Sequence, residues 1–360
     1  MYNSIARPRV ISVQDLDHVT SHIASLMVTW KNSRIMVTGA TGFFGQWLVE
    51  TFHHANQMLS LGAELLAVGG PNDDFALICP HILKMRDVTL INADICNLSL
   101  AMVREAPEWC DHIDAMIHAA IFVDNKTYDH EPMPTLTTGV KGTWEALEFA
   151  KRTKVKRFLY VSSGAIYGMQ PRNLDRIGEE HSADLDCANP ESAYAEGKRF
   201  GETLCCGYMR QYSLPVTIAR PFAFIGPYLP IDRHFAIGNF IRDALTEKSI
   251  VIQSDGSPVR SYLYAADLAI WLWTILVKGT PGRPYNVGAE QAFSLFEVAS
   301  LIEKASMRKN SIDIRGEKKT GLPSRYVPDI TRANQELGLK PTISLEDAIV
   351  RTLHWHRNAA

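Results

Sequence analysis

The chain has 360 residues, a formal net charge of −2 at pH 7, 46% hydrophobic residues and 21% charged residues. This balance gives no global attraction to nucleic acid or to an anionic membrane, and no apolar run is long enough to span a bilayer. The first ten residues lack the basic-then-apolar pattern of a secretory signal, and the six cysteines show no zinc-like or redox spacing. We therefore expect a cytoplasmic globular protein with free thiols, no bound metal, and no nucleic-acid or membrane partner.

Alternating strand and helix patterns predict the fold class. The expected strands are short apolar runs at Arg34–Thr38, Leu65–Val68, Thr89–Asn92, Ala115–His118 and Phe158–Val161. The expected helices cover residues 12–30, Gln46–Leu59, Thr143–Lys151, Asp267–Leu276 and Leu295–Lys304. This order predicts an α/β protein with a Rossmann-like, doubly wound parallel sheet and helices on both of its faces.

The same pattern predicts three parts of the chain. Residues 1–33 form an N-terminal helical extension, which we expect to pack on the surface of the core fold. Residues 34–220 form mainly the sheet domain. After about residue 220 the alternation loosens and Pro, Gly and aromatic residues become frequent, so residues 221–360 are expected to form mainly a smaller lobe beside the ends of the sheet.

A glycine-rich segment, Gly39-Ala-Thr-Gly42-Phe-Phe-Gly45, joins the first strand to the first long helix. The first glycine permits a tight turn, the second lets the backbone approach a pyrophosphate, and the third allows close helix–strand contact. The start of the helix adds unpaired N–H groups and the positive end of its dipole. We therefore predict a dinucleotide site formed by Gly39, Thr41, Gly42, Phe43, Phe44 and Gly45.

The three-residue spacing of these glycines resembles that of the short-chain dehydrogenase/reductase superfamily, in particular its extended branch, the NAD-dependent epimerase/dehydratase family. Asp94-Ile95 after the third strand is similar to that family's adenine-contacting pair, and His118-Ala119-Ala120 is similar to the segment that lines the cofactor. The resemblance also implies a cofactor contact at Pro221. The expected cofactor is therefore a nicotinamide dinucleotide.

The choice between NAD and NADP stays open at this point. NAD-preferring members of the family usually end the second strand with a carboxylate for the adenosine ribose. Here the strand ends Ala67-Val68-Gly69-Gly70, and no arginine follows to attract a 2′-phosphate. Asp73 and Asp74 are the candidates to substitute for the missing carboxylate.

A tyrosine and a lysine, Tyr194 and Lys198, are four residues apart, which places them on one face of a helix. Ser162 and Ser163 follow the fifth strand, at the sheet edge where ligands bind. A tyrosine with a pKa of about 10 is a poor base near neutrality, but a nearby ammonium and an oxidised nicotinamide favour the phenolate. We predict that Tyr194 exchanges the substrate's proton, that Lys198 also binds the nicotinamide ribose, and that Ser163, or Ser162 in its place, holds the reacting oxygen.

The family resemblance extends from Arg34 to about Pro341 and implies a nucleotide sugar as substrate. Arg260 is the candidate for the sugar-nucleotide diphosphate, because a guanidinium binds phosphate through two hydrogen bonds. The family often has asparagine where this chain has Thr138-Gly139 and Ala223. His234 and Asn239 are the candidates to replace those substrate contacts. The resemblance also implies a homodimer, through the helices at Thr143–Lys151 and Tyr194–Gln211.

Two further positions bear on the reaction. Sugar 4,6-dehydratases and the related decarboxylase carry an acidic residue just after the strand-end serine or threonine, where this chain has Gly164 and Ala165. Elimination of water then has no acid unless Asp175, Glu179 or Glu180 folds back into the site. We therefore predict an epimerase or a keto-sugar reductase. The alternatives are a 4,6-dehydratase with a rearranged acid and a non-catalytic, dinucleotide-binding regulatory protein.

Overall fold

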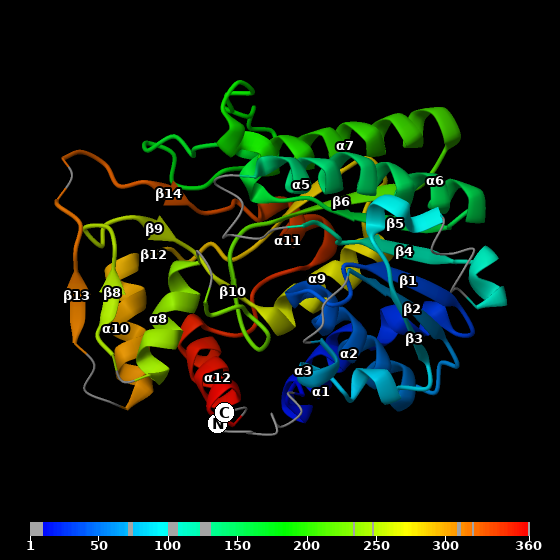
Figure 1. Ribbon diagram of the computed structural model, residues 1–360, viewed down its shortest axis with the longest axis horizontal. Coiled ribbons are helices and arrows are strands. Elements are labelled where there is room, and N and C mark those ends of the chain that lie inside the picture. The colour runs from blue at the N-terminus through cyan, green and yellow to red at the C-terminus, as the bar shows by residue number, and fades with distance from the viewer. Residues whose placement is uncertain are drawn as a thin grey trace.

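The computed structural model describes residues 10–70, 75–99, 107–122, 131–232, 235–246, 248–307, 311–318 and 320–358. A parallel sheet with helices on both faces forms the larger part of the molecule, and a lobe of short strands and helices lies beside it (Figure 1). The predicted fold class is confirmed.

Seven parallel strands form the central sheet, in the order β11-β6-β5-β4-β1-β2-β3. They are β1 (Arg34–Thr38), β2 (Glu64–Gly69), β3 (Val88–Asn92), β4 (Ala115–His118), β5 (Arg157–Val161), β6 (Val216–Pro221) and β11 (Pro284–Val287). The five predicted strands agree with these bounds to within one residue. Strands β6 and β11 were not predicted, because each contains a proline that weakens the strand pattern.

The two faces of the sheet pack into separate cores, because successive strand residues point to opposite sides. On β1, Ile35 and Val37 share a core with Trp47, whereas Met36 shares the other core with Phe149. The first face is covered by α2 (Phe43–Met58) and α9 (Ala265–Lys278), and α1 (Val13–Met27) packs on these two helices. The second face carries α5 (Pro132–Thr137), α6 (Thr143–Thr153) and α7 (Ala193–Tyr212) (Figure 1).

The chain order reverses between β1 and β4, which are neighbours in the sheet. The N–H of Ala119 donates to the Thr38 carbonyl at 3.2 Å, and the N–H of Ala120 donates to Thr38 Oγ1 at 3.4 Å. These bonds tie the end of β4 to the end of β1. In doubly wound sheets ligands bind at such a switch point, outside the carboxyl ends of the strands. Both Gly39 and Ala119-Ala120 lie there.

Helix α7 meets the preceding helical segment at two glycines. A π-helical turn, Thr138–Gly142, joins α5 to α6. A Cβ atom at Gly139 would lie 3.1 Å from the Cα atom of Gly197 on α7. A side chain at position 139 would therefore press against the backbone of α7. This close packing fixes the first turns of α7, which carry Tyr194 and Lys198.

The smaller lobe is built from short pieces over residues 224–358 and lies at the left of Figure 1. Three small sheets pair β7 (Phe224–Ile225) with β10 (Leu263–Tyr264), β8 (Ile250–Ile252) with β13 (Ile312–Ile314), and β9 (Val259–Arg260) with β12 (Phe293–Ser294) and β14 (Arg325–Tyr326). The helices are α8 (Ala236–Leu245), α10 (Leu295–Ser306), α11 (Thr331–Leu337) and α12 (Leu345–Asn358), and a short α3 (Phe75–Ile78) follows β2.

The division of the chain into lobes is not a simple cut at residue 220. Strand β11 and helix α9 come from the later part of the sequence, yet they complete the sheet and cover one of its faces. The division into residues 1–33, 34–220 and 221–360 therefore stays a prediction. The sheet itself contains strands from both halves of the chain. Among the described residues no helix is long and apolar enough to cross a bilayer.

The predicted N-terminal helix is present as α1 and joins the two lobes. Val19 and Ile23 are fully buried in the core shared with α2 and α9. Asp15, which is 2% exposed, accepts a hydrogen bond from the Tyr264 hydroxyl at 2.8 Å and an ion-paired one from Arg351 of α12. The helix therefore connects the sheet to the end of the chain.

Asp15→Ala is expected to lower the free energy of unfolding by about 3 kcal/mol, because it leaves a guanidinium and a buried hydroxyl without their acceptor. Asp17→Ala, on the exposed side of the same helix, is the matched control and is expected to cost less than about 0.5 kcal/mol. Urea denaturation measures both values. Equal losses in the two variants would contradict the connecting role of Asp15.

Candidate active site

The glycine loop forms a backbone cradle at the start of α2. Gly39 has a φ of +75°, and a Cβ atom there would lie 2.8 Å from the Ala120 nitrogen. A Cβ atom at Gly45 would lie 2.1 Å from the Gly39 carbonyl oxygen. Gly42, in contrast, is exposed and caps α2 without a side-chain hydrogen bond. The first turn of α2 therefore presents its N–H groups to the strand-end crevice, as a bound pyrophosphate requires.

The other predicted cofactor residues lie around the same strand ends. Phe43 and Phe44 are half-buried and pack against the core, while Ala119 and Ala120 are half-buried at the switch point. Asp94 is exposed and caps the turn Ile95–Asn97, accepting from Cys96 N and Asn97 Nδ2 at 2.9 Å each. The remaining two, Ile95 and Pro221, are buried.

The two glycines at the end of β2 differ in their surroundings, because a Cβ atom at Gly70 would meet open space whereas one at Gly69 would meet Thr41. A Cβ atom at Gly69 would lie 2.3 Å from Thr41 Cγ2 and 2.9 Å from Thr41 Oγ1. The threonine of the glycine loop thus occupies the space next to the strand end, where an acidic side chain would otherwise begin. Asp73 and Asp74, the predicted substitutes, lie outside the described residues.

A buried histidine ties the cradle to the helices above the sheet. His118 Nδ1 lies 2.7 Å from Thr38 Oγ1, and its Nε2 lies 3.2 Å from Thr143 Oγ1. Burial, with a smaller effect from Lys198, lowers the pKa of His118 to about 3. The imidazole is therefore neutral and holds β1, β4 and α6 in register. The sequence analysis named His118 only as part of the cofactor-lining segment His118-Ala119-Ala120, because a lone histidine carries no spacing signal for a role of its own.

The predicted catalytic residues of α7, Tyr194 and Lys198, lie near the end of the sheet. Lys198 is 2% exposed, and its Nζ donates to the Val161 carbonyl at the end of β5, at 2.7 Å. The ammonium also lies 5.3 Å from the centre of the Tyr160 ring. Burial lowers the pKa of Lys198 to about 7. Tyr194, one turn earlier, is half-buried and close enough to Tyr160 to influence its titration.

The two serines after β5 differ in their contacts. Ser163 Oγ accepts a hydrogen bond from the Ala165 N–H at 3.1 Å and so caps the following turn. Ser162 is 3% exposed, and its hydroxyl has no hydrogen-bond partner among the described residues. A buried hydroxyl without a partner is costly, and a ligand bound beside it would remove that cost. Because Lys198 contacts the residue just before Ser162, the structure brings the lysine and both serines together.

A second tyrosine, which the sequence pattern did not single out, reaches the same place. The Tyr326 hydroxyl on β14 lies 2.7 Å from the place where a Cβ atom of Gly164 would stand. Burial, with a further effect from Tyr194, raises the pKa of Tyr326 above its ordinary value. Its ring packs against Phe222, with the ring centres 4.7 Å apart. No sequence signal marks Tyr326, since it is an aromatic residue in a two-residue strand within an irregular stretch of chain.

The predicted substrate residues have three different outcomes. Arg260 on β9 is opposite Tyr326 in the pairing of β9 with β14, is half-buried, and forms no ion pair with a described residue. Its Nη1 donates to the Val259 carbonyl at 2.8 Å. Asn239 accepts from Arg242 Nη1 at 2.9 Å and lines a separate cavity of about 340 Å³ whose lining includes none of the predicted catalytic residues. His234 lies outside the described residues.

None of the three carboxylates considered as rearranged acids contacts the serines, Tyr194 or Lys198. Glu179 accepts from the Asn286 N–H at 2.8 Å, and burial raises the pKa of Glu179 above its ordinary value. Glu180 is exposed and pairs with Arg332. Asp175 is exposed and lies 3.6 Å from Arg325. Each is held by another partner.

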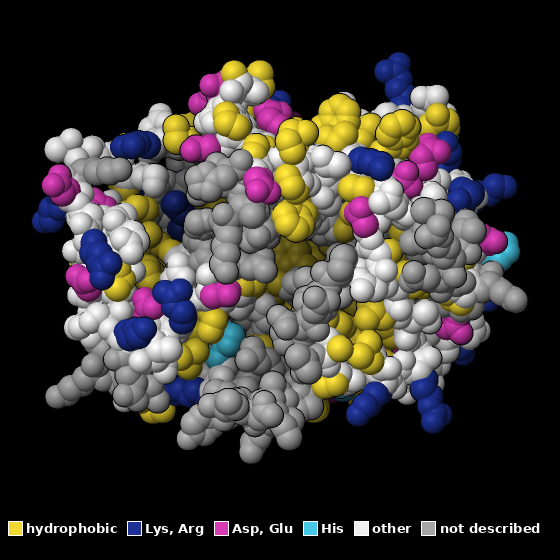
Figure 2. Space-filling view, in the orientation of Figure 1, with side chains coloured by type: hydrophobic (Ala, Val, Ile, Leu, Met, Phe, Trp, Pro, Cys, Tyr) yellow, Lys and Arg dark blue, Asp and Glu magenta, His cyan; other side chains and the backbone are white. Residues whose placement is uncertain are grey.

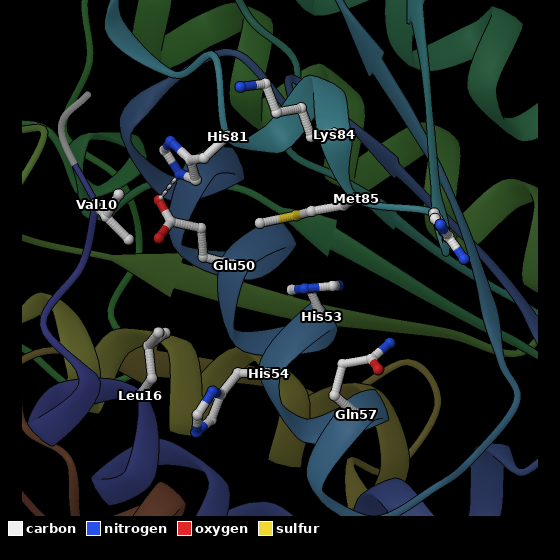
Figure 3. Close-up of a pocket in the computed structure, with 10 residues that line it drawn as sticks. Val10, Leu16, Glu50, His53, His54, Gln57, His81, Lys84 and Met85 are labelled. Atoms are coloured by element: carbon white, nitrogen blue, oxygen red, sulfur yellow. Dashed lines mark ion pairs between the residues drawn. The ribbon is translucent and has the colours of Figure 1, made fainter. Parts of the chain in front are cut away.

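The larger cavity, of about 430 Å³, lies away from these groups (Figure 3). Its walls come from the second half of α2, including Glu50 and His53, and from the segment just before β3, including His81 and Lys84. That segment enters β3 at its amino end, opposite the edge at which parallel sheets bind ligands. His81 and Glu50 form an ion pair 3.1 Å long. The polar residues of this cavity are therefore interpreted as part of the packing around α2.

Lys198→Met is expected to stabilise the protein without cofactor at pH 7 and below, because it removes a buried ammonium. The pKa of lysine falls from 10.5 unfolded to about 7 folded, so the cost of burying the charge is complete below pH 7 and disappears as the pH rises to 10.5. The advantage of the variant should therefore shrink between pH 7 and pH 9, by up to about 1.4 kcal/mol per pH unit. Lys151→Met, on the more exposed surface of α6, is the control, and a pH-independent advantage for Lys198→Met would contradict this account.

Gly42→Ala and Gly45→Ala are expected to separate cofactor binding from folding. A Cβ atom at position 42 meets only the Gly39 oxygen, at 3.3 Å, whereas one at position 45 meets backbone at 2.1 Å. Gly42→Ala should therefore fold normally but bind NAD at least about tenfold more weakly, because the methyl group enters the cradle. Gly45→Ala should lower the melting temperature. Calorimetric NAD titration and thermal melts measure the two effects, and unchanged NAD affinity in Gly42→Ala would overturn the assignment of the cradle.

Comparisons with known proteins agree with this geometry. The model of the NAD dependent epimerase/dehydratase family matches residues 35–288. UDP-glucuronic acid decarboxylase 1 of Xenopus tropicalis is 28% identical over 324 residues, covering 90% of this chain and 72% of the relative. UDP-glucuronic acid decarboxylase 5 of Arabidopsis thaliana is 29% identical, covering 88% of this chain and 87% of the relative.

Solved structures share the fold at lower identity. The epimerase Mth375 of Methanothermobacter thermautotrophicus superposes with a TM-score of 0.77 at 22% identity, covering 94% of this chain and 96% of that one. The UDP-glucuronic acid 4-epimerase of Bacillus cereus, solved with NAD, superposes with a TM-score of 0.74 at 24% identity, covering 90% and 99%. The family is one of NAD-dependent enzymes, so the predicted enzyme class and a nicotinamide dinucleotide as cofactor are confirmed. The glycine cradle, the partnerless Ser162 and the family model together show that this chain belongs to the NAD-dependent epimerase/dehydratase family.

Proposed function

We propose that this protein modifies a nucleotide sugar by oxidation or reduction at a ring carbon without eliminating water, as an epimerase or a keto-sugar reductase. The observation that carries the proposal is the filled space after the strand-end serines. A Cβ atom at Gly164 would lie 2.7 Å from the Tyr326 hydroxyl and 2.8 Å from the Phe222 ring. No acidic side chain fits there, and the neighbouring Ala165 has no proton to give. Elimination of water, which needs an acid for the leaving hydroxyl, therefore lacks its catalyst.

The chain's own groups can perform the remaining chemistry. Tyr194 takes the proton from a sugar hydroxyl as the carbon is oxidised and returns it when the ketone is reduced. Lys198, in its charged form, favours the phenolate of Tyr194 by Coulomb attraction. Ser163 holds the reacting oxygen. A bound nicotinamide dinucleotide supplies the hydride acceptor and donor.

NAD is the proposed form of this dinucleotide. Strand β2 ends in Gly69 and Gly70, so it carries no carboxylate that could bind the adenosine ribose or repel a 2′-phosphate. The support for NAD is the family's description as NAD-dependent and the lack of an arginine in the chain just after β2. Thr41 Oγ1, 2.9 Å from the place of a Cβ atom at Gly69, is a described group at this strand end that can hydrogen-bond a ribose hydroxyl.

The substrate proposal follows from Arg260 and from the relatives. Arg260 is half-buried beside Tyr326 and has no carboxylate partner among the described residues, which leaves its charge for a diphosphate. The relatives reported above act, by their names, on UDP-glucuronic acid. UDP-glucuronic acid is therefore the first substrate to test, and UDP-glucose, which is bound in a solved UDP-glucose 4-epimerase of Thermotoga maritima with this fold, is the second.

Decarboxylation is the second candidate, because relatives at 28–29% identity are decarboxylases. Oxidising carbon 4 of a hexuronic acid places a ketone β to the carboxylate, and a β-keto acid loses carbon dioxide without an acid for the leaving group. The missing acid at Gly164 and Ala165 therefore weighs less against decarboxylation than against dehydration. Loss of carbon dioxide from UDP-glucuronic acid would favour this candidate, and inversion at carbon 4 would favour the epimerase.

A homodimer through α6 and α7 is also proposed. Large hydrophobic side chains lie exposed on and near these helices, namely Met133, Trp144, Phe200 and Tyr212. Figure 2 shows hydrophobic side chains gathered over the part of the surface where α5 and α7 lie. Such an apolar face favours burial against a second copy.

Tyr194→Phe is expected to retain less than about a tenth of the wild-type turnover of the nucleotide sugar, with unchanged folding and NAD affinity, because only the proton-transferring oxygen is lost. Tyr212→Phe, at the exposed end of the same helix, is the matched control and should keep full activity. Product formation by NMR gives turnover, and calorimetry gives NAD affinity. Substantial activity in Tyr194→Phe would exclude this tyrosine as the base.

A further inference from the structure

An ion pair next to the candidate catalytic residues joins α7 to the sheet. Arg220 on β6 donates from Nε to Glu202 Oε1 at 3.0 Å and from Nη2 to Glu202 Oε2 at 2.7 Å. Both side chains are 12% exposed, so water competes little for the pair. The third nitrogen of Arg220, Nη1, donates to the Tyr167 hydroxyl at 2.8 Å and to the Glu179 carbonyl at 3.1 Å. One guanidinium therefore occupies both oxygens of Glu202 and is itself anchored at two further points.

Glu202 lies one helical turn from Lys198. The two residues are four apart on α7, so their side chains share a face of the helix and are within reach of each other. The Lys198 ammonium instead donates to the Val161 carbonyl at 2.7 Å, while Glu202 pairs with Arg220. Burial lowers the pKa of Lys198, and Cys205 and Glu202 partly offset that effect. The guanidinium of β6 thus holds a carboxylate that would otherwise draw the ammonium along the helix.

The sheet fixes the anchors of these two side chains relative to each other. Ala219, the residue before Arg220, is opposite Val161 in the pairing of β5 with β6. The carbonyl that accepts from Lys198 and the guanidinium that holds Glu202 therefore stand on neighbouring, hydrogen-bonded strands. A shift of the ammonium toward the carboxylate is opposed at both ends, by the Val161 carbonyl and by Arg220.

We propose that Arg220 is a positioning residue of the candidate site, which holds Glu202 and thereby leaves the Lys198 ammonium to the nicotinamide ribose and the catalytic phenol. This inference rests on the proposed role of Lys198 in the same site. Arg220 acts through Lys198 and contacts neither cofactor nor sugar itself. Its effect therefore depends on the presence of the Glu202 carboxylate, which an ordinary structural ion pair does not require.

The test compares NAD affinity, measured by calorimetry, in wild type, Arg220→Gln, Glu202→Gln and the double variant. Arg220→Gln should bind NAD about tenfold or more weakly, because the freed carboxylate draws the Lys198 ammonium away from the ribose. Glu202→Gln and the double variant should stay within about threefold of wild type, because neither has a carboxylate that competes for the ammonium. An ion pair with only a structural role predicts comparable losses in both single variants, since either substitution breaks it.

Two further comparisons separate this role from general damage. In a Lys198→Met background, Arg220→Gln should have no further effect on NAD affinity, because the group through which it acts is gone. Arg283→Gln is the matched control and should keep both NAD affinity and turnover. Arg283 likewise binds both oxygens of a glutamate, Glu336, which also accepts from the Tyr285 hydroxyl, but its side chain is 43% exposed.

Two results would overturn the inference. One is wild-type NAD affinity in Arg220→Gln, and the other is a loss in Glu202→Gln or in the double variant as large as that in Arg220→Gln. If Arg220→Gln does not fold, Arg220→Lys takes its place, because a lysine keeps a cation near Glu202 but cannot bind both of its oxygens. Arg220→Lys should then bind NAD at least about threefold more weakly and recover when combined with Glu202→Gln, and unchanged affinity would overturn the inference.

A failure of the proposed function is distinguishable from a failure of this inference. NAD affinity needs no sugar, so it tests Arg220 even if the wild type turns over neither UDP-glucuronic acid nor UDP-glucose. With a sugar that is turned over, kcat at saturating NAD should fall about tenfold in Arg220→Gln and recover in the double variant, while KM for the sugar stays within about threefold. Turnover combined with equal NAD affinity in all variants would keep the proposed function and overturn the role of Arg220.

Discussion

The burial of one ammonium group is the constraint on which the candidate site depends. Lys198 lies almost fully inside the protein, with its Nζ on the Val161 carbonyl at the end of β5 and beside the Tyr160 ring. Burial lowers the pKa of Lys198 to about 7, so the fold holds a charge that water would stabilise better. A nearby phenolate and hydroxyls of a bound ribose are the partners that would restore that stabilisation. The position of α7, and with it the Gly139–Gly197 contact, fixes where this charge stands.

Three glycines lie in the segments where the family resemblance led us to expect a polar or acidic side chain. Each of the three has a close neighbour in the structure. Thr41 fills the place beside Gly69, the backbone of α7 at Gly197 meets Gly139, and the Tyr326 hydroxyl covers Gly164. A side chain at any of these three glycines would have to displace its neighbour. The candidate site therefore relies on its hydroxyls and on Arg260.

Much of this site was predictable from sequence where the signal is local. Glycine spacing after a strand, the four-residue step from Tyr194 to Lys198 and serines at a strand end are short-range patterns, and the structure brings the lysine and both serines together at the sheet edge. Tyr326 was not predictable, because it comes from a two-residue strand far along the chain and comes close to Gly164 only in the folded protein, where β14 pairs with β9. The contact between Thr41 and Gly69 was hidden for the same reason, since it joins two loops of the folded protein. Strands β6 and β11 were missed because Pro221 and Pro284 weaken their patterns.

The most direct test of the central claim is hydride transfer to the protein's own cofactor. NAD-loaded protein is mixed with UDP-glucuronic acid or UDP-glucose carrying deuterium on carbon 4, the reaction is quenched while the cofactor is still reduced, and the cofactor is then recovered for mass analysis. The account predicts a transient absorbance of reduced nicotinamide and deuterium on the recovered cofactor, both lost in Tyr194→Phe. Altered sugar formed with no reduced nicotinamide and no deuterium transfer would contradict it.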